Sequence, residues 1–193
     1  MSNNLVTIMV GTSGAGKDHF IKEEILNNVA VYSNPVEIIS TDDYMQVCLD
    51  CNDRKANLAD GHPLRSPLLT PRCITHRFEY QFSFTNLELG HGLCYGTFSK
   101  MLELNYQHVV VNNTNTTVAE IGPYITCAQA RKAMGDEYEV EIVVVRCDPE
   151  VAAARNVHGV SLKAVRDMND RISHLLEKDW ARWYPNPRII DNG

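Results

Sequence analysis

The 193-residue sequence has no apolar run that approaches the roughly 18 residues of a membrane span, and its N-terminus lacks the basic lead of a secretory signal. It also lacks net positive charge. Its formal net charge of −6 argues against a protein that coats long duplex DNA through phosphate contacts. We therefore expect a cytoplasmic protein, in the host cytoplasm if the source is viral, with no membrane partner and no evident protein partner.

Charge is unevenly spread along the sequence. Residues 1–60 hold 4 basic and 9 acidic side chains, whereas residues 61–193 hold 14 and 15. The second part leaves room for local phosphate binding as well as for an ordinary solvated surface. In the cytosol we expect the six cysteines to be free, structural or metal-bound rather than paired in disulfides. The length predicts one domain, residues 1–193, with an insertion.

One glycine-rich stretch follows a predicted buried strand at residues 5–10 and precedes a helix-like segment at residues 19–27. Strand, glycine-rich turn and helix, with a lysine closing the turn, are the context of a P-loop. Such a loop points successive backbone N–H groups at phosphate, and its lysine adds positive charge. We therefore predict that this stretch binds a nucleotide. Its residues are Gly11, Thr12, Ser13, Gly14, Ala15, Gly16, Lys17 and Asp18.

Two residue types that P-loop enzymes use to hold magnesium are missing. The residue after the lysine is normally Ser or Thr, and here it is Asp18. The buried strand at residues 108–111 would normally end in an acid, and here Asn112 follows it. Because a carboxylate is a suitable Mg²⁺ ligand, we hypothesise that the carboxylate has moved from the strand end to the P-loop. Both side chains would then face one ion, and the formal charge of the site would be kept.

An acidic pair follows the short strand predicted at residues 36–40, in the run Ser40-Thr41-Asp42-Asp43-Tyr44. Ligands of open α/β sheets bind beyond the carboxyl ends of the strands. We expect one of the two acids to cap a helix and the other to do chemistry. Asp42 is the candidate general base.

Residues 46–79 form an irregular, cysteine-containing insertion with three prolines and little hydrophobic periodicity. Two pairs with two-residue gaps, Cys48 with Cys51 and Cys73 with His76, resemble a zinc knuckle pair, which would hold a structural Zn²⁺. A metal would explain how such a segment stays ordered. The intervals match no zinc module closely, so buried cysteines and a surface histidine are the alternative.

Three further elements are predicted between residues 86 and 145. They are a helix at 86–104, a helix at 118–134 and a buried strand at 139–145. In the second helix we expect Pro123 near a turn boundary and Gly135 as the stop. His91, on the first helix, is expected to be a hydrogen-bonded partner or to orient substrate.

The last third of the chain predicts two helices and a lid. Residues 148–150, Asp-Pro-Glu, are a strong helix start, Gly159 is expected to end that helix, and Ser161 to cap the next. The basic segment at about 155–162 lies where P-loop kinases keep a lid. We expect Arg155 to donate to nucleotide phosphates, with a surface ion pair as the alternative.

Four motifs, in this order, resemble the phage and animal polynucleotide 5′-kinases and their P-loop relatives, over residues 5–45 and 80–177. This resemblance implies an α/β fold with a small parallel sheet flanked by helices, ATP and Mg²⁺ as cofactors, and a nucleic acid or nucleotide as substrate. It implies that Asp42 accepts the proton of the attacking hydroxyl, that Lys17 holds the β- and γ-phosphates and that Arg155 contacts phosphate from the lid. The motifs are Gly11–Asp18, Ser40–Tyr44, Asn112–Asn115 and Arg155–Gly159.

Some positions depart from that family. Met45 stands where the phage enzyme has an arginine for the substrate's 3′-phosphate, and His158 stands where the lid has arginine or lysine. The leading hypothesis is an ATP-dependent kinase acting on a hydroxyl of nucleic acid, by default a 5′-OH. Two alternatives stay open. One is a kinase for a hydroxymethylated base, as in DNA modification, or for a small nucleoside; the other is a nucleotide-binding module without catalysis.

Overall fold

The computed structural model describes residues 4–27, 36–48, 78–80, 84–136, 138–180 and 184–193. The chain divides into two compact units, the first made of residues 1–38 and 101–193 and the second of residues 39–100. Each unit is described by itself below. One kinase domain with an insertion at 46–79 stays a prediction, since most of that segment lies outside the described residues.

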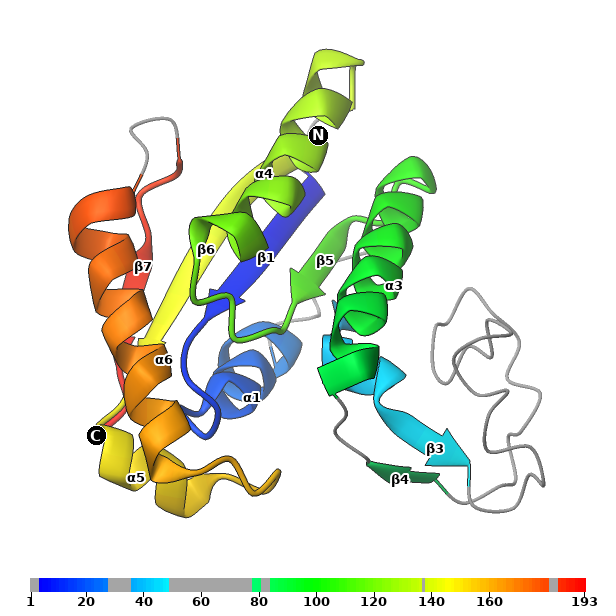
Figure 1. Cartoon of the computed structure of the whole chain (residues 1–193). Coiled ribbons are helices and arrows are strands. Elements are labelled where there is room, and N and C mark those ends of the chain that lie inside the picture. The colour runs from blue at the N-terminus through cyan, green and yellow to red at the C-terminus, as the bar shows by residue number, and fades with distance from the viewer. Residues whose placement is uncertain (1–3, 28–35, 49–77, 81–83, 137, 181–183) are drawn as a thin grey trace. The chain divides into compact units, whose positions relative to one another are not determined.

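The first unit is built on a five-stranded sheet with the strand order β2-β5-β1-β6-β7 (Figure 1). The pairings of β1 with β5 and β6, and of β6 with β7, are all parallel. This confirms the predicted small parallel sheet. The central strand is buried along its second half, as expected of a parallel strand covered on both faces. The strands are β1 (Asn4–Val10), β2 (Glu37–Ile39), β5 (His108–Val111), β6 (Tyr138–Arg146) and β7 (Arg188–Asp191).

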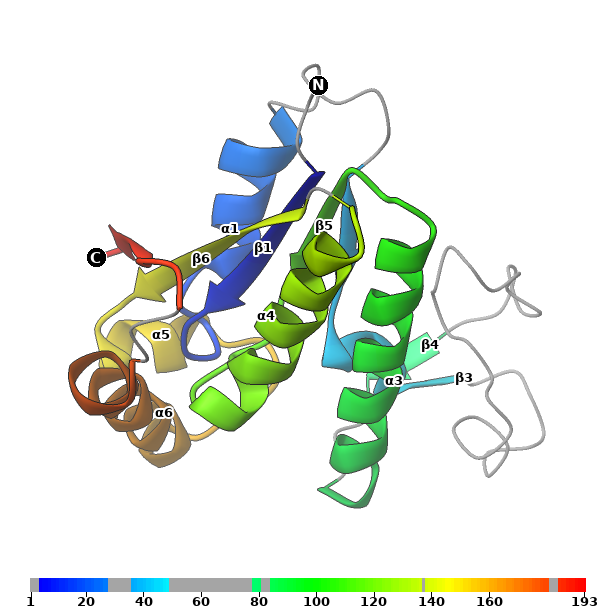
Figure 2. The same ribbon diagram turned by 90° about the horizontal axis from the view of Figure 1, so that it is seen from above.

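Helices cover both faces of this sheet, and Figure 2 shows α1 and α4 on opposite sides of it. The predicted first helix begins as α1 and continues as the π-helix η1, which packs Ile21 and Ile25 against Met9 and Val143 in the core. None of the helices in the described part of the chain is long and apolar enough to cross a membrane. The helices of this unit are α1 (Lys17–Phe20), η1 (Ile21–Ile25), α4 (Val118–Ala133), α5 (Pro149–Arg155), α6 (Leu162–His174) and η4 (Leu175–Asp179).

Two expectations about helix ends were wrong. Pro123 lies inside α4 rather than at a turn boundary, so this helix lacks one backbone hydrogen bond. Helix α5 ends at Arg155 and not at Gly159. The reason is local: Asn156 is extended (φ −68°, ψ 123°), and its Oδ1 accepts a hydrogen bond from the backbone N–H of His158 at 2.6 Å. An asparagine side chain that binds the backbone two residues on competes with the helix.

The second unit contains a short 3-10 helix, a pair of antiparallel strands and most of α3. The helix predicted at 86–104 is confirmed as α3. Its Gly90 packs tightly: a Cβ there would lie 2.9 Å from the Met45 methyl carbon and 3.1 Å from Thr41 Cγ2. The absence of a side chain at Gly90 therefore permits α3 to approach the 3-10 helix η3 and the residue after it, Met45. The elements are η3 (Thr41–Tyr44), β3 (Gln46–Cys48), β4 (Phe78–Tyr80) and α3 (Phe84–Glu103).

A polar pair is buried inside the first unit's sheet. Thr7 on β1 and His108 on β5 are 0% and 2% exposed, and Thr7 Oγ1 lies 2.9 Å from His108 Nε2. Because Leu5 pairs with His108, Thr7 is two residues further along and projects from the same face. Burial disfavours the charged imidazolium and lowers the pKa of His108 to about 4.

We predict that this histidine makes the fold acid-sensitive. The unfolded chain binds a proton near the ordinary pKa of 6.5, and the folded chain only near 4, so the stability that His108 contributes is complete above pH 6.5 and lost as the pH falls toward 4. In H108Q, the slope of the unfolding free energy against pH should shrink in this window by up to about 1.4 kcal/mol per pH unit. Denaturant unfolding at several pH values measures it. The control H174Q removes an exposed histidine and should keep the wild-type slope; equal slopes for wild type and H108Q would contradict the prediction.

Candidate active site

The P-loop of the first unit is packed so closely that two of its glycines are required. Gly14 and Gly16 have φ of 80° and 98°, in the left-handed region that favours glycine. A Cβ on Gly14 would lie 2.0 Å from the backbone oxygen of Ala152 in α5. Ala15, between them, is fully buried. The conformation that a phosphate-binding loop needs is therefore set by neighbouring backbone.

Lys17 folds back over this loop. Its Nζ donates hydrogen bonds to the backbone oxygens of Gly11 at 3.1 Å and Thr12 at 2.9 Å. The ammonium thus lies beside the backbone that, in a P-loop, surrounds the phosphates. From this position the Lys17 ammonium can exchange its hydrogen bonds to the loop's carbonyl oxygens for contacts with the phosphates of a nucleotide.

Asp18 and Asn112 lie in direct contact. Asn112 Nδ2 donates a hydrogen bond of 2.6 Å to Asp18 Oδ1. The two substitutions noted in the sequence therefore face each other. Asn112 Oδ1 is buried, and within the described part of the chain nothing donates a hydrogen bond to it. A carboxylate beside an amide oxygen in need of a partner is a donor set that suits a hard cation such as Mg²⁺ or its bound water.

The segment after β5 fastens the P-loop from the other side. The backbone N–H of Gly11 donates to the oxygen of Thr114 at 2.9 Å. Asn115, itself in the left-handed region with φ of 49°, donates from Nδ2 to the backbone oxygen of Met9 at 2.8 Å. The predicted Asn112–Asn115 motif thus supplies both a site residue and the residues that hold the loop against the sheet.

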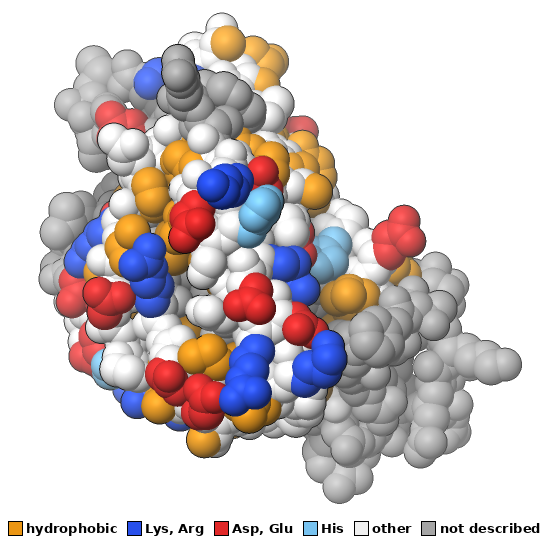
Figure 3. All heavy atoms as spheres, turned by 60° about the vertical axis from the view of Figure 1, so that its left-hand side comes forward, with side chains coloured by type: hydrophobic (Ala, Val, Ile, Leu, Met, Phe, Trp, Pro, Cys, Tyr) orange, Lys and Arg blue, Asp and Glu red, His pale blue; other side chains and the backbone are white. Residues whose placement is uncertain are grey.

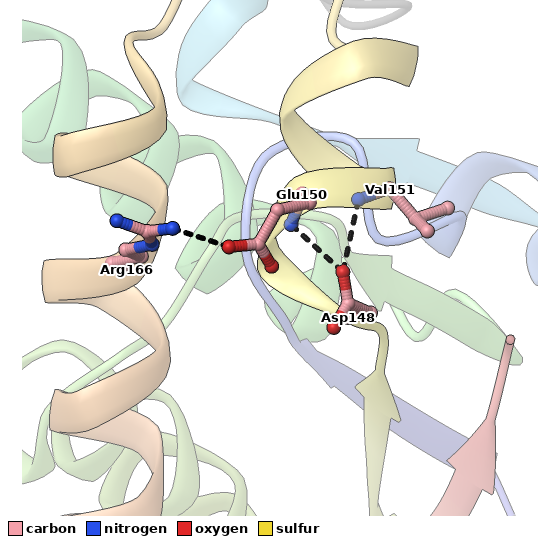
Figure 4. A network of polar contacts seen from close by, with 4 residues as sticks. All are labelled: Asp148, Glu150, Val151 and Arg166. Carbon is pink, nitrogen blue, oxygen red and sulfur yellow. Dashed lines mark hydrogen bonds and ion pairs between the residues drawn. The ribbon is translucent and has the colours of Figure 1, made fainter.

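Helices α5 and α6, on either side of the predicted lid segment, are joined by an ion pair (Figure 4). Asp148 caps α5 by accepting hydrogen bonds from the backbone N–H groups of Glu150 and Val151, as predicted. Arg166 on α6 donates to the Glu150 carboxylate, and this hydrogen bond lowers the pKa of Glu150. The predicted lid arginine, Arg155, donates from Nη1 to the backbone oxygen of Asn192 at 3.2 Å. Its contact with phosphate stays a prediction.

The charge pattern around the lid is mixed. The face shown in Figure 3, which carries α5, α6 and β7, has basic and acidic side chains interspersed over it. The exposed Lys163–Asp167 and Arg166–Glu150 pairs belong to this pattern. Such a face offers individual charged contacts rather than a continuous basic surface.

In the second unit, the two acids after β2 have separate roles. Ser40 and Asp43 form a capping box, with the Ser40 N–H donating to Asp43 Oδ2 at 3.1 Å. Asp42 is exposed, and the Tyr80 hydroxyl donates to its Oδ1 at 3.2 Å. Burial and then the nearby Asp42 charge raise the pKa of Tyr80, which keeps this phenol a donor. Asp43 thus completes the capping box of η3, in which Ser40 is the N-cap, and the role of Asp42 as a general base stays a prediction.

His91, in the second unit, is a hydrogen-bonded partner, which is one of the two roles expected for it. Its Nδ1 is 3.2 Å from Thr41 Oγ1, so α3 and η3 are joined by a hydrogen bond beside Asp42. Sequence reasoning missed Tyr80 and Asn192 altogether. Each meets its partner only through folding, and neither stands in a motif that would have singled it out.

The zinc hypothesis gains no support. Cys51, Cys73 and His76 lie outside the described residues, and only the backbone of Cys48, in β3, is described. Over the described ranges, no group of three or more His, Cys, Asp or Glu could hold a metal ion.

Comparison with known proteins now adds to this geometry. The model of an AAA domain family matches residues 6–161, a range that includes the P-loop, Asp42, Asn112 and Arg155. The chain belongs to this AAA domain family. The match supports a P-loop phosphotransferase, and ends before β7.

Two solved structures share the fold of this AAA domain protein. One is a chain of the Pnkp1/Rnl/Hen1 RNA repair complex, with a TM-score of 0.59 and 14% identity over 97% of this protein. The match covers 49% of that chain, so the AAA domain protein spans about half of its length. The other is a gluconokinase from Sinorhizobium meliloti 1021, with a TM-score of 0.51 and 11% identity over 99% of this protein and 84% of that chain. At these identities the two structures show a shared fold, that of P-loop kinases.

We predict that G14A unfolds the P-loop region whereas G92A does not. Gly14 has no room for a methyl group and has positive φ, so G14A should lower the unfolding free energy by about 3 kcal/mol or more. A Cβ on Gly92, inside α3, meets nothing within 4 Å, so G92A should be neutral or stabilising by up to about 1 kcal/mol. Chemical denaturation measures both. A G14A protein as stable as G92A would contradict the described packing.

Proposed function

We propose that this protein is an ATP-dependent kinase that transfers the γ-phosphate to a hydroxyl on nucleic acid, by default the 5′-OH of a polynucleotide. The observation that carries this proposal is the hydrogen bond between Asn112 and Asp18 beside the P-loop. This hydrogen bond holds a carboxylate beside the P-loop, where we propose that the metal binds, although neither of the usual residues is present.

In the proposed reaction, the backbone N–H groups of the P-loop and Lys17 hold the β- and γ-phosphates. Asp18 and Asn112 would hold Mg²⁺, which supplies positive charge to the phosphates when bound. The acceptor oxygen forms a bond to the γ-phosphorus while the bond from that phosphorus to the β–γ bridging oxygen breaks, and ADP leaves. Asp42 takes the acceptor's proton, and the Tyr80 hydroxyl orients its carboxylate.

Two observations favour nucleic acid as the acceptor. Four motifs that resemble those of the polynucleotide 5′-kinases are present in order, and one of the solved structures that share the fold is a chain of an RNA repair complex. The proposal therefore places the acceptor hydroxyl at the end of a nucleic acid chain rather than on a sugar acid.

The residue at position 45 favours a different acceptor. Met45 stands where the phage enzyme has its arginine for the substrate's 3′-phosphate, and Met45 is 2% exposed and packs against Gly90. Because this side chain is part of the packing, it offers nothing to a 3′-phosphate. A hydroxymethylated base in DNA, or a small nucleoside, is therefore the second candidate, since neither needs that contact.

The test is transfer of labelled γ-phosphate from ATP to three kinds of acceptor: a 5′-OH oligonucleotide, a duplex with hydroxymethylated bases, and nucleosides. We expect label on the oligonucleotide that a phosphatase specific for terminal phosphates removes. Label on the duplex that resists this phosphatase would favour the second candidate instead. ATP binding without transfer to any acceptor would contradict a kinase and leave a nucleotide-binding module.

Two variants control this assay. D42N should lower turnover about 10²–10⁴-fold, the usual contribution of a general base, and leave ATP affinity nearly unchanged. D43N is the matched control: its amide oxygen can still accept the hydrogen bond from Ser40, so turnover should stay within a few-fold of wild type. Full activity in D42N would remove Asp42 as the base.

We further predict that Asp18 and Asn112 are energetically coupled. D18S leaves the site without a carboxylate, and N112D sets two carboxylates against each other, so each single variant should lose about 100-fold in turnover. The double variant D18S/N112D restores the usual arrangement and should recover at least about 10-fold relative to either single variant. Steady-state rates across a range of Mg²⁺ concentrations measure this cycle. Losses that simply multiply, with no recovery, would contradict the coupling.

A further inference from the structure

Asn192 follows β7 and is held in place by the sheet. Its backbone N–H donates to the oxygen of Arg146 at 2.9 Å, which extends the parallel pairing of β7 with β6 by one more hydrogen bond. The family match ends at residue 161, so it assigns nothing to this position. The place of the Asn192 side chain is thus set by the same sheet that carries the P-loop.

The side chain of Asn192 lies against the P-loop. Its Nδ2 donates to the backbone oxygen of Ala15 at 2.8 Å. It is so close to the next residue that a Cβ on Gly16 would lie 2.1 Å from this nitrogen. The contact is therefore made to one peptide group, the one that joins Ala15 to Gly16.

This peptide group matters because its other end is an N–H of the P-loop. No described peptide bond is cis, and in a trans peptide the C=O and the N–H point in opposite directions. When Asn192 holds the Ala15 oxygen on its own side, the N–H of Gly16 points to the other side. P-loops bind phosphate through backbone N–H groups, so the amide fixes the orientation of one of these donors.

Asn192 also accepts a hydrogen bond from Arg155, at the end of α5. Arg155 donates from Nη1 to the backbone oxygen of Asn192 at 3.2 Å. Asn192 therefore contacts the P-loop through its side chain and α5 through its backbone. Replacing the Asn192 side chain removes the hydrogen bond to Ala15 and keeps the backbone oxygen that accepts from Arg155. Mutation can therefore separate the two contacts.

We propose that Asn192 is a positioning residue of the nucleotide site, which holds the Ala15–Gly16 peptide so that the Gly16 N–H faces the nucleotide phosphates. This inference rests on the ATP-dependent function proposed above. It concerns ATP affinity alone, because the side-chain hydrogen bond of Asn192 is made to the P-loop.

The test compares N192A and N192D with the control N186A, which removes an exposed asparagine two residues before β7 begins. Calorimetry measures the Kd for Mg-ATP, and steady-state kinetics measure KM for ATP and for the acceptor. N192A loses one hydrogen bond and should weaken ATP binding about 3–10-fold. N192D, nearly the same size, should weaken it more, since its carboxylate repels both the Ala15 oxygen and the phosphates. N186A should match wild type.

The outcomes separate this inference from the proposed function. If wild type does not bind ATP, the function itself fails. If wild type binds ATP and both Asn192 variants bind it equally well, the positioning role fails and the function stands. Lower thermal stability with unchanged ATP affinity, or an equal rise in KM for the acceptor, would also overturn it. If N192A does not fold, the nearly isosteric N192D gives the same comparison.

Discussion

The hydrogen bond between the Asn112 amide and the Asp18 carboxylate joins the end of β5 to the P-loop, and the account of the site depends on it. The two residues are 94 positions apart in the chain. They meet because β1 and β5 are parallel neighbours, so their carboxyl ends lie at the same edge of the sheet. At such an edge a carboxylate can be supplied from either strand's following segment. We propose that the site keeps its formal charge in this way, with the carboxylate on Asp18 in place of the strand end.

The same edge of the sheet explains why the P-loop holds its shape. The loop is bonded to the segment after β5 through Gly11, packed on α5 at Gly14, and bonded to the end of β7 at Ala15. Each of these three neighbours follows the carboxyl end of a strand of the sheet, namely β5, β6 or β7. A loop fixed on three sides presents its N–H groups without rearrangement, which is the condition for strong electrostatic binding of phosphate. The buried Thr7–His108 pair lies within the sheet that supports this edge.

The parts that could be predicted from the sequence have local causes. Continuous apolar runs predicted β1, β5 and β6, because parallel strands buried on both faces lack alternation. Short motifs predicted the P-loop and the Asp148 cap. By contrast, β7 has only two apolar residues between charged ones, and its place comes from pairing with β6. Contacts across 38 positions, for Tyr80, and 177, for Asn192, leave no local pattern, and the side chain of Asn156 ended α5 against its helical neighbours.

A structure of the protein with Mg²⁺ and a non-hydrolysable ATP analogue tests the central claim most directly. The account predicts that the β- and γ-phosphates lie against the P-loop N–H groups and that the Asp18 carboxylate and the Asn112 oxygen lie at the metal, directly or through one of its waters. Such ligands lie about 2.1 Å from Mg²⁺ when bound directly. A triphosphate bound away from the P-loop, or a metal held without either side chain, would contradict it.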